Sequence, residues 1–93
     1  MEKKRLTADK YLELQKEHPS TLHQKLQDVL LSVSWREFSN RYMGKKGGWI
    51  YDKINGFNQY GEPVPPMTDE ELTNFKNGLF DLSERIKKIA ESL

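Results

Sequence analysis

Apolar positions recur along the chain at intervals of three and four residues, the spacing typical of amphipathic helices. The longest such face keeps a 3-4-3-4 rhythm through Leu72, Phe75, Leu79, Leu82, Ile86, Ile89 and Leu93. A shorter face after Pro19 and Ser20 contains Leu22, Leu26, Val29, Leu30 and Val33, and predicts a core helix. We therefore expect an all-α fold: one domain over residues 1–93, a small bundle of four to five helices.

Helix-start and helix-stop residues divide the first half of the chain. A first helix is expected over residues 8–18, because the residue before Pro19 is driven out of the α region. Farther on, Ser34 and Glu37 have the spacing of a capping box, in which the hydroxyl and the carboxylate each accept a hydrogen bond from the other residue's backbone N–H. This box predicts a short helix over about residues 35–42.

Two glycines delimit the next predicted helix. Gly44 supplies the positive φ of a tight helix exit, and Gly56 follows a second helix that begins within residues 46–48. Two short helices joined by a few residues around a glycine have the size of a helix-turn-helix, which we place at about residues 34–56.

The carboxyl-terminal third is divided between a connection and one long helix. Residues 57–67 contain three prolines and a glycine, which predicts a loop. Thr68 and Glu71 form a second capping box, so a helix is expected over about residues 69–92. At 1.5 Å per residue this helix is roughly 36 Å long, so part of it is expected to protrude.

A helix that enters a DNA groove needs an apolar side toward its scaffold and a polar side toward the DNA. We assign the scaffold role to Trp35, Phe38, Gly44, Trp49, Ile50, Ile54 and Gly56. We expect the DNA-binding side chains to be Arg41, Lys45, Lys46, Tyr51, Lys53 and Asn55.

Charge distribution favours the same segment. The formal net charge is only +1, so bulk charge indicates neither nucleic acid nor membrane as a partner. Residues 34–56, however, carry five Lys or Arg residues against two acids, whereas residues 57–93 carry four against seven. The predicted helix-turn-helix is therefore the clearly basic part of the chain.

The stretch "SWREFSNRYMGKKGGWIYDKINGF" resembles the helix-turn-helix of lambda-repressor-like regulators. In that pattern Phe38 and Ser39 match an apolar residue followed by a small one, Gly44 the turn glycine, Ile50 the apolar anchor and Gly56 the closing glycine. With "TDEEL" and "LFDLSERI", the chain also looks like a family of short uncharacterised bacterial proteins, a domain of unknown function with a suspected helix-turn-helix. The resemblance implies a fold and a DNA-binding role.

Other classes of chemistry lack a motif. The chain has no cysteine, and its two histidines, His18 and His23, lack metal-ligand spacing, so we expect no metal and no cofactor. No nucleophile elbow or P-loop is present, so we expect no enzyme activity. No apolar run is long enough to span a bilayer, and a cytoplasmic protein is expected.

Two functions follow as hypotheses. The first is a small DNA-binding protein, a transcriptional regulator or accessory factor that binds double-stranded DNA through its helix-turn-helix. The alternative keeps the same scaffold without DNA binding and uses the long carboxyl-terminal helix to bind a partner or to form a homodimer.

Overall fold

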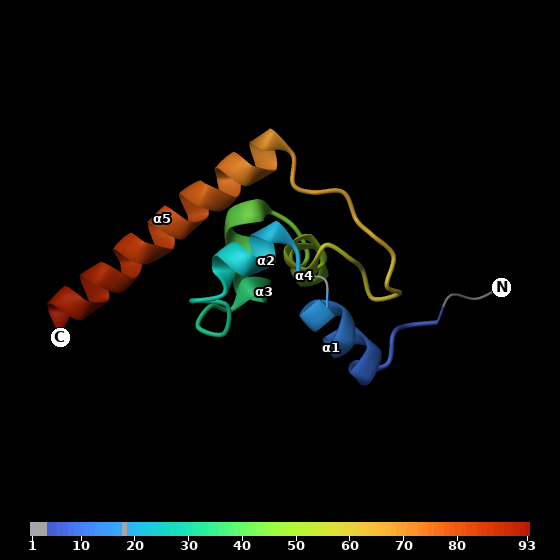
Figure 1. Cartoon of the computed structure of the whole chain (residues 1–93). Helices are drawn as coiled ribbons and strands as arrows, with labels where there is room; N and C mark the ends of the chain where they lie inside the picture. Colours follow the sequence, from blue (N-terminus) through green and yellow to red (C-terminus); the bar gives the residue numbers. More distant parts are fainter. Residues whose placement is uncertain (1–3, 18) are drawn as a thin grey trace.

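Helices make up most of the described part of the chain, residues 4–17 and 19–93, in the computed structural model (Figure 1). In order they are α1 (Ala8–Glu17), α2 (Thr21–Leu26), α3 (Trp35–Phe38), the π-helical turn η1 (Ser39–Met43), α4 (Gly47–Asn55) and α5 (Asp69–Ser92). The described residues form no sheet; Phe57 and Pro63 make one isolated β-bridge. The predicted all-α class is confirmed, while the expected last residue of the first helix, His18, lies outside the described residues.

The predicted helix-start signals act as side-chain caps. The Thr68 hydroxyl accepts a hydrogen bond from the Glu71 N–H (3.1 Å), and the Glu71 carboxylate accepts one from the Thr68 N–H (2.9 Å). At α3 the Ser34 hydroxyl accepts from the Glu37 N–H at 3.4 Å, which is the first half of the predicted box. Ser20 caps α2 in the same way. These caps satisfy N–H groups that the first turn of a helix leaves without a partner.

The predicted core helix through Val33 is wrong in length. α2 ends at Leu26, and the chain continues through residues 27–33 as a series of turns. The indole N–H of Trp35 donates to the Leu30 carbonyl oxygen (2.8 Å), so this segment turns back toward the start of α3. As a result Leu26 is buried, whereas Val29 is exposed. Leu22, Leu30 and Val33 pack against the core from its edge.

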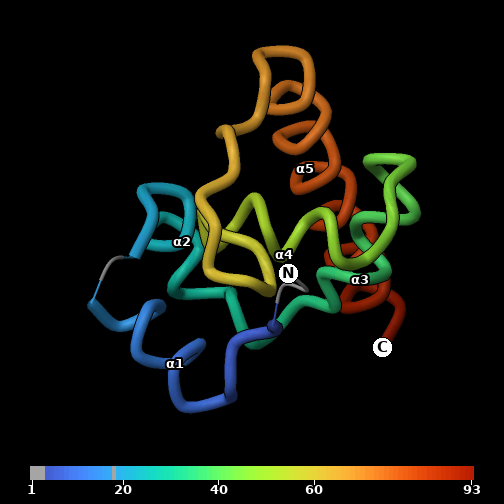
Figure 2. Tube along the Cα trace, turned by 90° about the vertical axis from the view of Figure 1, so that its right-hand side faces the viewer, coloured from blue at the N-terminus to red at the C-terminus, as the bar shows by residue number. Residues whose placement is uncertain are grey.

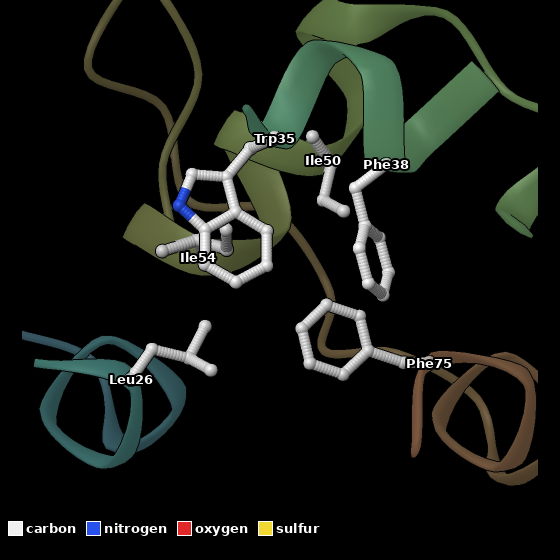
Figure 3. Packing of buried hydrophobic residues seen from close by; sticks show 6 residues of the cluster. All are labelled: Leu26, Trp35, Phe38, Ile50, Ile54 and Phe75. Atoms are coloured by element: carbon white, nitrogen blue, oxygen red, sulfur yellow. The ribbon is translucent and has the colours of Figure 1, made fainter. Parts of the chain in front are cut away.

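The core is a cluster of aromatic and branched side chains contributed by four helices (Figure 3). The rings of Trp35 and Phe75 stack at 6.0 Å between centroids with only 12° between their planes. Phe38 contacts both rings, at 5.5 Å and 5.2 Å. Leu26, Ile50 and Ile54 complete the cluster. The aromatic contacts hold α3 and α5 together, and the two isoleucines hold α4 against them.

The long helix α5 leaves the core after its first half, as Figure 1 shows. Phe75 and Gly78 are buried, but Ile86 and Ile89 are 58% and 61% exposed. The Tyr42 hydroxyl donates to the Asp81 carboxylate (2.6 Å) and accepts from the Arg85 guanidinium (2.7 Å), which ties η1 to the middle of α5. The predicted protrusion of this helix is confirmed. No helix in the described ranges combines the length and apolarity needed to cross a membrane.

Candidate functional site

The turn between η1 and α4 is held by one buried hydroxyl. Gly44 adopts φ +62°, as predicted, and its N–H donates to the Ser39 carbonyl oxygen. The Lys45 N–H donates to the same oxygen (3.1 Å), and the fully buried Ser39 hydroxyl donates to the Lys46 carbonyl oxygen (2.8 Å). The backbone of the turn is thereby fixed, while the side chains of Lys45 and Lys46 remain exposed.

Sequence reasoning did not give Ser39 this role. The sequence did contain a signal for this role: Ser39 is a small polar residue directly after the apolar Phe38. A small side chain inside a helix allows the next segment of the chain to approach closely. The hydroxyl then satisfies carbonyl oxygens that the turn would otherwise bury without a partner.

The amino-terminal end of α4 keeps free backbone donors. Lys46 occupies the capping position without a side-chain hydrogen bond to the helix. Within the described residues, no hydrogen bond engages the N–H groups of Gly47 and Gly48. Free N–H groups at a helix start attract anions, particularly where cationic side chains lie beside them.

Trp49 lies at the edge of the core, between two lysines. The Lys45 Nζ is 5.7 Å from the centroid of the Trp49 ring, and the Lys53 Nζ is 5.9 Å from it. Trp49 is half-buried and packs only on the outside of the core cluster, so its predicted role as an inward anchor is correct only in part. The Lys53 Nζ also donates to the Pro65 carbonyl oxygen (2.7 Å). This contact directs the lysine toward the loop after α4.

Asn55 is buried, and the prediction that it faces DNA is wrong. Its side chain is 6% exposed, its Nδ2 donates to the Tyr11 hydroxyl, and its Oδ1 accepts from the Gln15 Nε2 (3.0 Å). Asn55 lies one turn after Tyr51, and its two hydrogen-bond partners, Tyr11 and Gln15, both belong to α1. A polar side chain there links two helices and is not available to a ligand.

The other predicted residues lie where the sequence placed them. Ile50 and Ile54 are buried, as are Trp35 and Phe38, and Gly56 closes α4 with φ +84°. Arg41 is exposed at the end of η1, and Tyr51 is 41% exposed. Arg41, Lys45 and Lys46 are therefore all exposed, the two lysines within the turn and Arg41 three residues before Gly44.

Two carboxylates reduce the positive potential of this surface. Burial raises the pKa of Asp52 on α4, although neighbouring Lys53 opposes that shift. The pKa of Glu71 is lowered, first by its hydrogen bond with the Thr68 backbone and also by the charges of Lys53 and Lys45. The start of α5 thus places a negative charge within electrostatic reach of two of the predicted DNA-binding lysines.

A known protein family covers the part of the chain that forms this surface. A family model described as Domain of unknown function (DUF5053) matches residues 22–93. The chain belongs to this DUF5053 family. Searches of curated proteins and of solved structures found no match. The matched region runs from the second residue of α2 through α5, so the whole core and the turn at Gly44 lie inside the family domain, whereas α1 precedes it.

Proposed function

We propose that this DUF5053 domain is a small DNA-binding protein, a regulator or accessory factor that binds the phosphate backbone of duplex DNA with the unit α3–η1–turn–α4 used as a helix-turn-helix. One observation carries the proposal. The exposed Lys45 and Lys46 stand on a turn fixed by Ser39, beside the free N–H groups of Gly47 and Gly48. Cations and backbone donors in this arrangement suit phosphate contact.

The exposed side of α4 favours backbone contact over base reading. Gly48 has no side chain, Asp52 is acidic, and Asn55 is buried, so the helix offers none of the Arg, Asn or Gln side chains that commonly read base edges. We expect weak sequence preference and a strong dependence of affinity on salt, because neutralised phosphates release counterions.

Fluorescence anisotropy with a labelled duplex tests this proposal. The plot of log affinity against log salt should have a negative slope, and the Lys45→Ala/Lys46→Ala variant should lower its magnitude by about 2, since each lost phosphate contact removes roughly 0.9. Adding Lys53→Ala should weaken binding less, because Lys53 also holds the loop at Pro65.

The matched control is Lys87→Ala/Lys88→Ala, which removes the same charge from exposed positions on α5. It should leave the salt slope close to that of the parent chain. A Lys45→Ala/Lys46→Ala variant that binds duplex DNA as tightly as the parent at low salt contradicts the proposal, as does an equal loss in the control.

A second candidate function is self-association through α5, and the exposed end of its apolar face favours it. Ile86 and Ile89 continue the spacing of Phe75 and Leu82 beyond the core and stay exposed. Packing this face against that of a second copy would form a homodimer.

Sedimentation velocity over a range of protein concentrations, with and without duplex DNA, separates the two candidates. If α5 drives self-association, the sedimenting mass rises with protein concentration alone, and Ile86→Gln/Ile89→Gln abolishes the rise. Phe80→Gln is the control, because Phe80 is 71% exposed but lies on another side of α5. A chain that stays monomeric without DNA at every concentration rules out the homodimer.

A further inference from the structure

A cavity of about 660 Å³ lies between α2, the end of α4, the loop before α5 and the first half of α5. Figure 2 shows this loop, in yellow and orange, passing alongside α4 and close to α2. The buried side chains of Leu26 and Phe75 line the cavity, and the remaining apolar lining includes Leu22, Met67 and Leu79. The size lies within the roughly 300–1,000 Å³ of small-molecule sites.

One wall of this cavity is stiff. Val64, Pro65, Pro66 and Met67 supply it, and each proline fixes its own φ and restricts the residue before it. The Lys53 Nζ donates a hydrogen bond to the Pro65 carbonyl oxygen, and the Val64 N–H donates to the Gly56 carbonyl oxygen (3.1 Å). The cavity is therefore a property of the folded chain that does not require a ligand to open it.

The charged residues that line the cavity are all cationic. Lys25 comes from α2, Lys53 from α4 and Lys76 from α5, and no Asp or Glu contributes to the lining. Among the described residues none of the three forms an ion pair with a carboxylate. The acids whose charges reach Lys53 are its neighbour Asp52 and Glu71, and the Glu71 carboxylate already accepts the Thr68 N–H. In the described part of the chain, three lysines without a carboxylate partner therefore line this apolar cavity, and one of them, Lys53, donates to the Pro65 carbonyl oxygen.

We propose that this cavity binds an anionic amphiphile: a molecule with a single apolar chain and a carboxylate headgroup. The apolar chain lies over Leu26 and Phe75, and the headgroup lies among the ammonium groups of Lys25, Lys53 and Lys76. Burial of the chain supplies the affinity, and the lysines select a negative headgroup over a neutral or positive one. The cavity includes neither Lys45 nor Lys46, although it shares Lys53 with the proposed DNA-binding surface.

A second copy of this chain fits the cavity less well. The exposed end of α5 carries Glu84 and Glu91 together with Arg85, Lys87 and Lys88, so it offers no excess of negative charge to the three lysines. The electrostatic match therefore favours a ligand that is anionic as a whole.

Isothermal titration calorimetry with alkyl carboxylates of increasing length, each below its micelle concentration, tests the proposal. Octanoate, decanoate and dodecanoate should bind one molecule per chain, and affinity should rise about fourfold per added methylene until the cavity is full. The alcohol and the alkyltrimethylammonium ion of the same chain length should bind at least tenfold more weakly.

Lys25→Gln/Lys76→Gln is the diagnostic variant, because both side chains are exposed and their replacement leaves the core intact. It should lower carboxylate affinity about tenfold and leave alcohol affinity unchanged. Lys45→Gln/Lys46→Gln, which removes the same charge elsewhere, should change neither. Circular dichroism verifies that all the variants are folded.

Three results overturn the proposal. One is the absence of decanoate binding to the folded parent chain. Another is equal affinity for the carboxylate and the alcohol, unaffected by Lys25→Gln/Lys76→Gln. The third is an acidic amphipathic peptide that binds more tightly than dodecanoate and loses affinity in that variant, which assigns the cavity to a protein partner.

Discussion

Gly78 of α5 lies against the ring of Phe38 so closely that a Cβ atom at position 78 would come within 2.7 Å of the Phe38 Cζ. The same atom would lie 2.9 Å from both Cβ and Cγ of Tyr42. Phe38 is the buried last residue of α3, and Tyr42 lies in η1, which continues the same helical segment under α5; the Tyr42 Cβ is fixed to that backbone and cannot swing away. The absent side chain is what permits the two helices to approach.

We expect Gly78→Ala to destabilise the chain even though alanine is the better helix former. The gain in helix propensity is about 1 kcal/mol, while overpacking a core costs typically about 1–3 kcal/mol. Urea denaturation followed by circular dichroism should show a net loss of stability. An increase in the denaturation midpoint would contradict the close approach of α5 to Phe38.

Gly48 provides the opposite case within the same chain. A Cβ atom there would meet no heavy atom within 4 Å, and Gly48 is not among the residues with positive φ. Gly48→Ala should therefore stabilise the chain by about 0.5–1 kcal/mol through helix propensity alone. The same urea experiment measures it. If Gly48→Ala and Gly78→Ala both lowered stability, the different space around the two glycines would not determine the effect of the added methyl group.

Replacement of Asn55 should uncouple α1 from the core. Asn55→Ala leaves the Tyr11 hydroxyl and the Gln15 amide without their buried partner, which costs about 1–3 kcal/mol. Limited proteolysis should then cleave α1 faster, while the DNA affinity of the folded chain stays unchanged. Gln15→Ala removes one of the same contacts and should have a smaller effect. A specific loss of DNA affinity in a stable Asn55→Ala variant would return Asn55 to the proposed DNA-binding surface.

Asp52 should make stability depend on pH in the acid range. Burial raises its pKa in the folded chain, so the folded state binds this proton more tightly than the unfolded state does. The ionised carboxylate is therefore destabilising above the folded pKa, and the penalty disappears below the unfolded value. Asp52→Asn should raise stability at neutral pH by on the order of 0.5 kcal/mol, because water screens this half-exposed group.

Urea midpoints of Asp52→Asn and the parent chain, compared from pH 7 down to pH 3, check this sign. The two curves should converge as pH falls. A difference that widens toward low pH would mean that the ionised Asp52 stabilises the fold.

Local signals in the sequence were sufficient for most helix boundaries. Gly44, Gly56 and the Thr68–Glu71 box act within one turn of the chain, so their outcome depends little on distant residues. The end of α2 and the burial of Asn55 depend instead on residues outside those helices. The Trp35 indole N–H donates to the Leu30 carbonyl oxygen, and α1 covers Asn55. Helical periodicity contains no information about either contact.

The two candidate sites, the turn at Lys45 and Lys46 and the cavity, also differ in whether local sequence could predict them. Exposure of Lys45 and Lys46 followed from their place in a turn, which the glycine pattern marks. The cavity lined by Lys25, Lys53 and Lys76 could not be predicted, because its lysines come from three helices that are separate in sequence. Its recognition requires the tertiary arrangement of those helices.

Glu71 offers a test of whether Lys45 and Lys53 act on DNA. Its lowered pKa means that its contribution to stability is present above the unfolded pKa and is lost as pH falls through the folded pKa. In Glu71→Gln the glutamine amide oxygen can still accept the hydrogen bond from the Thr68 N–H, but the negative charge that acts on Lys45 and Lys53 is removed. We expect a small loss of stability and at least a twofold gain in duplex affinity at low salt, since one opposing charge has been removed.

Glu70→Gln makes the same change of net charge one residue earlier, so an equal gain there would assign the effect to net charge. If neither variant strengthens binding, the lysines beside Glu71 do not contact phosphate.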